Sequence, residues 1–319
     1  MPSASDNGSA GTRTFNMKIH FFLAAVAALA LTGSAIAATI DEDDPNYAAY
    51  EETELSIPMK DADGEELELS GKLCVPSDAE GKARLVIINH GSPAKASDRP
   101  TMQLGDCDSE VAQWFLSRGL AVLYALRRGY GDTGGEWAEQ YGPCDDPDYA
   151  RAGLESARDI GAMVAFATRQ PGVRPDGVII AGVSAGGWAT MAYDSVPHPK
   201  AIAFINMAGG RGGHRNGQPN ANCHPERLAD AAAIFGRTAR TPMLWVYAQN
   251  DTYFRPEIAR AMYQAFTRSG GKAEFHALGP NGSEGHYLWS ADGGSEVWGP
   301  LVEAYLRKMG ALDQADSRD

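Results

Sequence analysis

A single serine, Ser184, stands between an apolar β-branched segment and a helical segment, with glycine two positions before it and two after it. Residues 177–181 (GVIIA) are typical of a buried strand, and residues 187–193 (GWATMAY) are typical of a helix start. An abrupt change from strand to helix requires a tight turn, in which Gly182 and Gly186 leave room that side chains would fill. We therefore expect Ser184 at the apex of a strained turn, exposed at the end of a strand.

The rest of the chain alternates between strand and helix patterns in the same way. Apolar strand patterns occupy residues 54–58, 67–75, 85–89, 120–126, 201–206, 243–247 and 273–278. Helical patterns occupy residues 108–117, 148–169, 225–235, 255–269 and 295–309. The first two strands, joined by Asp61–Gly64, are expected to form an antiparallel hairpin. The chain is thus expected to have an α/β fold: a mostly parallel sheet of about eight strands with helices on both faces.

Two residues far along the chain can complete a catalytic constellation with Ser184. A serine hydroxyl is a weak nucleophile unless a base takes its proton and a third group orients that base. Asp251 follows the strand at 243–247, and His286 follows the strand at 273–278, so both are expected at the edge of the sheet that carries Ser184. We predict Ser184 as the nucleophile, His286 as the base and Asp251 as the orienting carboxylate.

Other residues compete for these roles. The histidines that could replace His286 are His90, His214, His224 and His276. His276 lies inside a strand, His90 is better explained as a brace for its loop, and the other two lie in a glycine-rich segment. Glu284 is the nearest acidic rival of Asp251 but is too close to His286 in sequence. The alternative role of Asp251 is an Asx turn or a helix cap.

Two backbone amides near Ser184 are expected to stabilise a developing oxyanion. The first belongs to Ala185, which directly follows the serine at the start of a helix. The second belongs to Ser92, in the segment His90-Gly91-Ser92-Pro93 that follows the strand at 85–89. Gly91 would let this backbone approach closely, and an ordinary strand-ending turn is the alternative interpretation.

Substrate contacts are expected from the segment after the strand at 120–126. Arg127, Tyr130 and Trp137 could bind a carboxylate or an aromatic part of a substrate. In the alternative, Arg127 and Arg128 pair with neighbouring carboxylates and only hold the loop; the candidate partners are Asp132, Glu136 and Asp145. The glycine-rich segment 209–214 lacks a phosphate-loop motif, so residues 209–240 are interpreted as a small lid-like segment.

The N-terminal region has the pattern of a signal peptide. A short basic start at Met17-Lys18 precedes an apolar core at 21–31 and a small-x-small cleavage site at Ala35-Ile36-Ala37. An uncleaved anchor is the alternative, and either Met1 or Met17 could be the true start. The expected organisation is an extension and signal peptide at 1–37, a loose acidic lead-in at 38–50 and one catalytic domain at 51–319. The mature protein is therefore expected to be secreted or periplasmic.

The chain has 41 acidic and 28 basic residues, and its net charge of −13 argues against nucleic acid or an anionic membrane as a partner. The four cysteines, Cys74, Cys107, Cys144 and Cys223, contain no C-x-x-C spacing, so no metal site is expected. In an exported protein they can form disulfides. A Cys107–Cys144 bond is favoured and Cys144–Cys223 is the second choice, because these three residues are expected near the carboxyl edge of the sheet.

Together these motifs resemble the α/β-hydrolase superfamily, and within it the dienelactone-hydrolase and prolyl-oligopeptidase-like branch. The motifs are His90-Gly91-Ser92, the segment 127–135 (RRGYGDTGG), Gly182–Gly186, Asn250-Asp251 and Gly285-His286. Dienelactone hydrolases have a cysteine nucleophile where this chain has Ser184. Oligopeptidases carry a large β-propeller domain, and here only about 50 polar residues precede the core.

The resemblance implies a serine hydrolase that needs no cofactor. The two departures favour a secreted esterase acting on a small-molecule ester. A small secreted serine peptidase with the same three residues is the first alternative, and a non-catalytic binding protein with this fold is the second. The sequence leaves the acyl group, the alcohol and the oligomeric state open.

Overall fold

The computed structural model describes residues 47–79 and 81–312. Within them, eight strands form one sheet in the order β1-β2-β4-β3-β5-β6-β7-β8. The strands are β1 (Tyr50–Lys60), β2 (Glu66–Pro76), β3 (Arg84–Asn89), β4 (Leu120–Ala125), β5 (Val178–Val183), β6 (Ala201–Met207), β7 (Met243–Ala248) and β8 (Ala273–Leu278). The predicted signal peptide at 1–37, and the lead-in up to residue 46, lie outside the described residues.

The predicted hairpin is confirmed, and its strands are longer than the sequence pattern indicated. β1 pairs with β2 along its whole length in antiparallel register, from Tyr50↔Pro76 to Lys60↔Glu66. The Asp61 carboxylate stabilises the turn, because its Oδ1 accepts the backbone N–H groups of Asp63 and Glu65, both at 2.9 Å. Strand β2 then joins the sheet antiparallel to β4, and all later neighbours are parallel.

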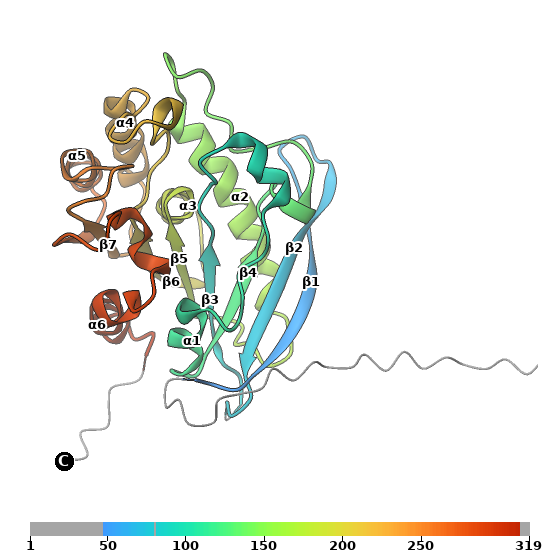
Figure 1. Cartoon of the computed structure of the whole chain (residues 1–319). Helices are drawn as coiled ribbons and strands as arrows, with labels where there is room; N and C mark the ends of the chain where they lie inside the picture. Colours follow the sequence, from blue (N-terminus) through green and yellow to red (C-terminus); the bar gives the residue numbers. More distant parts are fainter. Residues whose placement is uncertain (1–46, 80, 313–319) are drawn as a thin grey trace, which may run out of the picture. The chain divides into compact units, whose positions relative to one another are not determined.

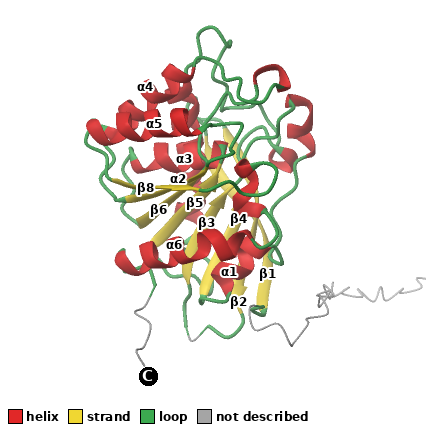
Figure 2. Ribbon diagram, turned by 60° about the vertical axis from the view of Figure 1, so that its left-hand side comes forward, coloured by secondary structure: helices red, strands yellow, loops and turns green. Residues whose placement is uncertain are grey.

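Helices cover both faces of the sheet, as predicted (Figures 1 and 2). They are α1 (Glu110–Leu116), α2 (Tyr149–Ala167), α3 (Ala185–Asp194), α4 (Pro225–Gly236), α5 (Pro256–Arg268) and α6 (Gly294–Lys308). Helices α2 to α5 share one buried core, and α1 and α6 share the other. Successive strand residues divide between the two cores: Leu85 and Ile87 face the first, and Val86 and Ile88 face the second.

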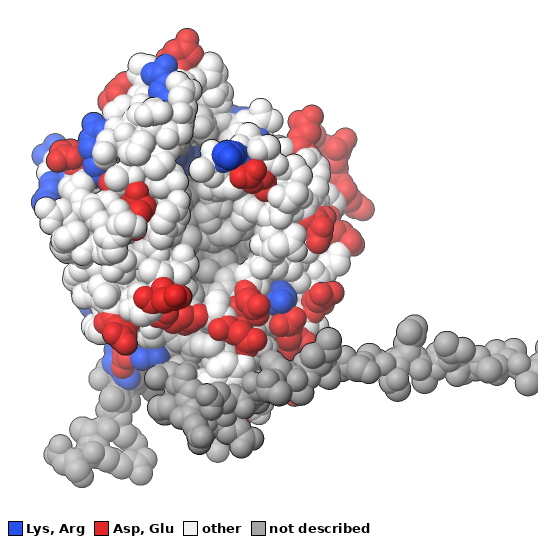
Figure 3. Space-filling model, viewed as in Figure 1, with Lys and Arg blue, Asp and Glu red and all other residues white. Residues whose placement is uncertain are grey.

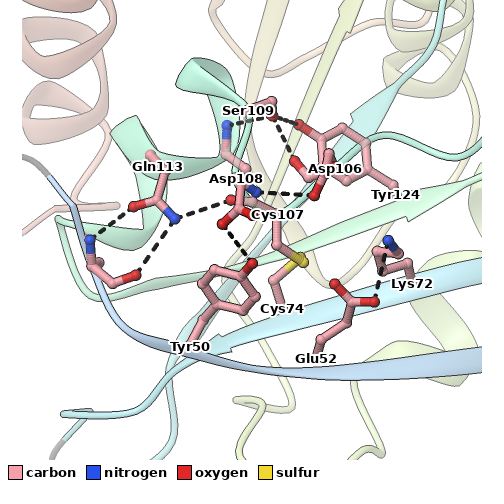
Figure 4. The surroundings of a disulfide bond; sticks show 12 residues. Tyr50, Glu52, Lys72, Cys74, Asp106, Cys107, Asp108, Ser109, Gln113 and Tyr124 are labelled. Carbon is pink, nitrogen blue, oxygen red and sulfur yellow. Dashed lines mark hydrogen bonds and ion pairs between the residues drawn. A yellow bond between two sulfur atoms is a disulfide. The ribbon is translucent and has the colours of Figure 1, made fainter. Parts of the chain in front are cut away.

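The favoured disulfide Cys107–Cys144 was wrong. Cys74 is bonded to Cys107, with Cα atoms 6.0 Å apart, and Cys144 is bonded to Cys223, with Cα atoms 5.0 Å apart. Cys107 lies in the segment before α1 and is joined there to Cys74 of β2 (Figure 4). Because Cys74 is in register with Val122, inside β4, this bond lies within the sheet's strands and not at the carboxyl edge where Cys107 was expected.

The second-choice bond, Cys144–Cys223, is present in the structure. It joins the segment after β4 to the segment after β6, across 79 residues of sequence. The predicted lid-like segment 209–240 contains an irregular part and then α4, which packs extensively on α5 and also contacts α2. Its role as a lid stays a prediction.

Acidic side chains gather on the lower part of the face shown in Figure 3, in the region where Figure 1 places α1 and α6. This distribution agrees with the negative net charge. Across residues 47–79 and 81–312, no helix is long and apolar enough to span a membrane.

Candidate active site

Ser184 occupies the tight turn between β5 and α3. Its φ of 55° and ψ of −120° are unusual for a residue other than glycine. The flanking glycines are sterically required. A Cβ at Gly182 would lie 2.3 Å from the Gly186 carbonyl oxygen, and one at Gly186 would lie 2.0 Å from the Asn89 carbonyl oxygen. The turn therefore brings the serine against the end of β3.

The backbone around Ser184 is held by three hydrogen bonds. Its N–H donates to the Met207 carbonyl at 3.0 Å, and its carbonyl accepts the N–H groups of Trp188 at 3.0 Å and Gly210 at 3.1 Å. The side chain is half-buried, and no other described residue hydrogen-bonds its Oγ. The hydroxyl is thus positioned by its backbone and is open on one side.

Asp251 and His286 meet at the carboxyl edge of the sheet. Asp251 follows β7, and His286 lies in the 3₁₀ helix η4 (Gly285–Ser290) after β8. His286 Nδ1 is 3.0 Å from Asp251 Oδ2, and the two residues are 4% and 1% exposed. Asp251 Oδ1 accepts the N–H groups of Tyr253 and Phe254, both at 2.8 Å. An ionised carboxylate only accepts, so Nδ1 carries the proton and Nε2 is left as the acceptor.

Tyr253, which sequence reasoning missed, and Glu284 and His214, which it rejected for the catalytic roles, support this histidine. The Tyr253 ring stacks on the His286 ring at 4.2 Å between centroids, and the His214 ring stacks on Tyr253 at 3.5 Å. Glu284 Oε1 accepts the backbone N–H groups of His286 and Thr252, both at 3.0 Å. Glu284 therefore orders the backbone, whereas Asp251 binds the imidazole. Tyr253 gave no sequence signal beyond its place after Asp251.

The segment after β3 lies directly against the serine. A Cβ on Gly91 would lie 3.3 Å from Ser184 Cβ. His90 braces this segment: its Nδ1 is 2.7 Å from the Gly91 carbonyl oxygen, and its Nε2 accepts the Arg127 N–H at 3.1 Å. Burial, together with the charge of Arg127, lowers the pKa of His90 to about 3. Since both ring nitrogens are occupied by backbone groups, His90 is not free to act as a base.

Of the two predicted oxyanion donors, Ala185 directly follows Ser184, and Ser92 directly follows Gly91, whose backbone lies against the serine side chain. Ala185 is the first residue of α3, where backbone N–H groups have no partner within the helix. Ser92 is half-buried in the segment that contains Gly91. Their action on a substrate oxygen stays a prediction.

The predicted substrate contacts of Arg127 and Tyr130 do not fit the structure, because both side chains are 0% exposed. Arg127 forms an ion pair with Glu139, and the Tyr130 hydroxyl donates to the same carboxylate at 2.8 Å. Trp137 is half-buried; its Nε1 donates to the Tyr130 hydroxyl at 3.0 Å. Of the three, only Trp137 retains exposed surface for a substrate.

The alternative interpretation, that the arginines hold their loop, agrees with these contacts. Arg128 binds Asp159 at 2.6 Å and Glu155 at 3.0 Å. The carboxylates concerned are therefore Glu139, Glu155 and Asp159, not the three nearby residues expected from the sequence. In the part of the chain that the structure describes, no group of three or more His, Cys, Asp or Glu side chains could hold a metal ion.

Comparison with known proteins gives one family match by sequence. The model of the prolyl oligopeptidase family matches residues 107–200, a span that contains Ser184 but neither Asp251 nor His286. The search of curated proteins gave no match.

Solved structures match over most of the chain. An acylaminoacyl peptidase in complex with Z-Gly-Gly-Phe-chloromethyl ketone has a TM-score of 0.61 at 18% identity, covering 84% of this chain and 43% of the peptidase. An esterase from Pyrococcus furiosus has a TM-score of 0.54 at 18% identity, covering 82% and 94%. A protein from Klebsiella pneumoniae described as a dienelactone hydrolase has a TM-score of 0.54 at 16% identity, covering 82% and 99%. This chain thus spans less than half of the peptidase, and its fold is the one that these hydrolases share.

Proposed function

We propose that this chain, which has the α/β-hydrolase fold and resembles its prolyl-oligopeptidase and dienelactone-hydrolase members, is a serine hydrolase of carboxylic esters. The observation that carries the proposal is the buried 3.0 Å contact between His286 and Asp251. It occurs at the sheet edge where the strained turn presents Ser184. An imidazole held in one tautomer by a carboxylate, at the sheet edge that also carries a half-buried serine, supports activation of the serine hydroxyl for attack.

In the proposed mechanism, Ser184 Oγ attacks the ester carbonyl carbon while His286 Nε2 takes the hydroxyl proton. Asp251 keeps the other ring nitrogen protonated and stabilises the imidazolium that forms. The negative oxygen of the tetrahedral intermediate accepts hydrogen bonds from the amides of Ser92 and Ala185. His286 then donates its proton to the leaving alcohol, giving an acyl-enzyme on Ser184, which a water activated by the same imidazole hydrolyses.

No hydrogen bond joins His286 Nε2 to Ser184 Oγ among the described residues. This does not argue against the mechanism, because catalytic hydrogen bonds in unliganded enzymes are often long and tighten only when substrate binds. The Gly91 backbone against the serine Cβ supports the proposed position of the oxyanion donors.

A serine peptidase is the second candidate, favoured by the prolyl oligopeptidase match over residues 107–200. Both activities use the same three side chains and differ in the bond that is cleaved. We favour the esterase because the esterase from Pyrococcus furiosus matches this chain over 94% of the esterase's own length, with a TM-score of 0.54. For location, two disulfides are typical of an oxidising compartment, and we propose export through the segment at 1–37.

The test is steady-state turnover of nitrophenyl esters of increasing acyl length, measured beside aminoacyl nitroanilides. We expect ester hydrolysis that falls by about 10⁴-fold or more in Ser184→Ala, Asp251→Asn and His286→Gln. Ser195→Ala, at the other end of α3, is the matched control and should keep full activity. Turnover of anilides alone would favour the peptidase, and full ester turnover by Ser184→Ala would contradict the proposal.

A further inference from the structure

A buried carboxylate, Glu139, gathers four donors beside the candidate active site. It accepts hydrogen bonds from Arg127 Nε, from Arg211 Nη2 at 2.6 Å, and from the hydroxyls of Tyr130 and Ser156, both at 2.8 Å. Glu139 and Arg127 are 0% exposed, and Arg211 is 4% exposed. Three ionised side chains are thus removed from water in one place.

Such a cluster is expensive to bury and is not needed for ordinary packing. Taking ions out of water costs free energy that their mutual attraction recovers only with good geometry, and apolar residues often stabilise a core equally well. Burial alone would raise the pKa of Glu139, but the guanidinium groups of Arg127 and Arg211 outweigh it and hold that pKa below its usual range. The carboxylate therefore stays charged and binds both arginines.

From this cluster, contacts run to the predicted oxyanion segment. Arg127 Nη2 donates to the His90 carbonyl at 2.9 Å, and the Arg127 backbone N–H donates to His90 Nε2 at 3.1 Å. The Tyr130 hydroxyl lies 3.1 Å from Ser92 Oγ. The segment at 90–92 is thus fixed at its first and last residue by groups that Glu139 binds.

Other contacts run to the nucleophile side. Arg211 directly follows Gly210, whose N–H donates to the Ser184 carbonyl at 3.1 Å. Arg211 Nη2 binds Glu139 and also Ser156 on α2. One carboxylate therefore connects the segment after β3 with the segment after β6, which contact Ser184 from two sides.

We propose that Glu139 is a positioning residue for the hydrolase reaction: through Arg127, Tyr130 and Arg211 it sets the distance between the 90–92 segment and Ser184. This inference rests on the proposed function. Glu139 itself touches no substrate. If the segment shifts, the Ser92 amide moves away from the position that the oxyanion occupies, while binding of the uncharged ester is little affected.

The experiment compares Glu139→Gln with Asp159→Asn. Asp159 is a matched control because it is equally buried and binds the neighbouring Arg128, yet it has no contact with the 90–92 segment. Both changes remove one carboxylate charge from a buried ion pair and should lower the melting temperature. Only Glu139→Gln should lower kcat, by about 100-fold, with KM changed less than about threefold.

The inhibition constant of a trifluoromethyl ketone is a second measurement, and a loss of stability alone does not change it. The Ser184 hydroxyl oxygen adds to the ketone carbonyl carbon and its proton passes to His286, so the carbonyl oxygen becomes an oxyanion that requires the same amides as the transition state. The ketone's inhibition constant should rise in Glu139→Gln by about the factor that kcat/KM falls, and should be unchanged in Asp159→Asn. Equal changes of kcat and of this constant in the two variants would overturn the inference.

Tyr130→Phe covers the case in which Glu139→Gln fails to fold. It removes the hydroxyl beside Ser92 and leaves the three charges in place, so kcat should fall by about tenfold with the same KM. An unchanged kcat would contradict the proposed connection. Failure of the proposed function can be distinguished from failure of this inference. If the proposed function is wrong, the unsubstituted protein hydrolyses no ester and Ser184→Ala does not change that turnover.

Discussion

Replacing Gly186 with alanine would test how closely β3 and the serine turn are packed. A Cβ at this position would lie 2.0 Å from the Asn89 carbonyl oxygen and 2.6 Å from that of His90. Ordinary contacts of this kind begin at 3.4 Å, so the two backbones would have to separate by about 1.4 Å. Neither contacting atom belongs to a flexible side chain, so the strain cannot be relieved by a rotamer change.

The displacement acts directly on catalysis, because the moving backbone carries the predicted oxyanion donor. Overpacking of a well-packed core costs about 1–3 kcal/mol of unfolding free energy. A misplacement of about 1 Å costs about 100-fold in rate. We therefore expect Gly186→Ala to lower kcat for a nitrophenyl ester by about 100-fold or more, although Ser184, Asp251 and His286 are all retained.

The assay is steady-state kinetics together with a thermal melt. Gly161→Ala, inside α2, is the matched control, since its Cβ would meet Tyr193 at an ordinary 3.8 Å. This control should keep its activity and gain about 0.5–1 kcal/mol of stability. A Gly186→Ala protein with kcat within threefold of the original would refute the packing on which the prediction depends.

Three further outcomes are expected. Tyr253→Leu removes the ring stacked on His286 and should lower kcat by about tenfold, whereas Tyr253→Phe should keep most of the activity. Replacing Cys144 and Cys223 with serine should lower the unfolding free energy, measured in denaturant, by about 2–4 kcal/mol. The folded chain keeps His90 neutral down to about pH 3, while the unfolded chain protonates it near pH 6.5. The free energy of unfolding should therefore fall as the pH drops through this window. His90 contributes at most about 1.4 kcal/mol per pH unit to this fall, and solvent screening of the half-buried residue makes its contribution smaller. In His90→Gln the fall should be shallower; an identical slope would contradict the neutral imidazole.

Much of the fold could be predicted from sequence because its signals are local. Strands such as residues 85–89 and 120–125 can be recognised from a few consecutive apolar residues, and the strand, turn and helix around Ser184 follow from adjacent residues. The approach of Asp251 to His286 could be predicted as well, since both follow parallel strands that end at one edge.

The ion cluster and the disulfides could not be predicted in this way. Glu139 is separated in sequence from Arg127 by 12 positions and from Arg211 by 72 positions. All three residues lie in irregular segments, where charged residues are usually exposed. Sequence therefore left a substrate contact open for Arg127, which the structure buries. Cys107 was misplaced because the path of a long irregular segment before α1 depends on packing that no local pattern encodes.

The central claim is that Ser184 is the nucleophile. Its most direct test is mass spectrometry of peptides after treatment with a fluorophosphonate, which bonds covalently to activated serine. We predict a single adduct on the peptide that contains Ser184, lost in Ser184→Ala and formed far more slowly in His286→Gln. An adduct on another residue, or an equally fast adduct without His286, would contradict this account.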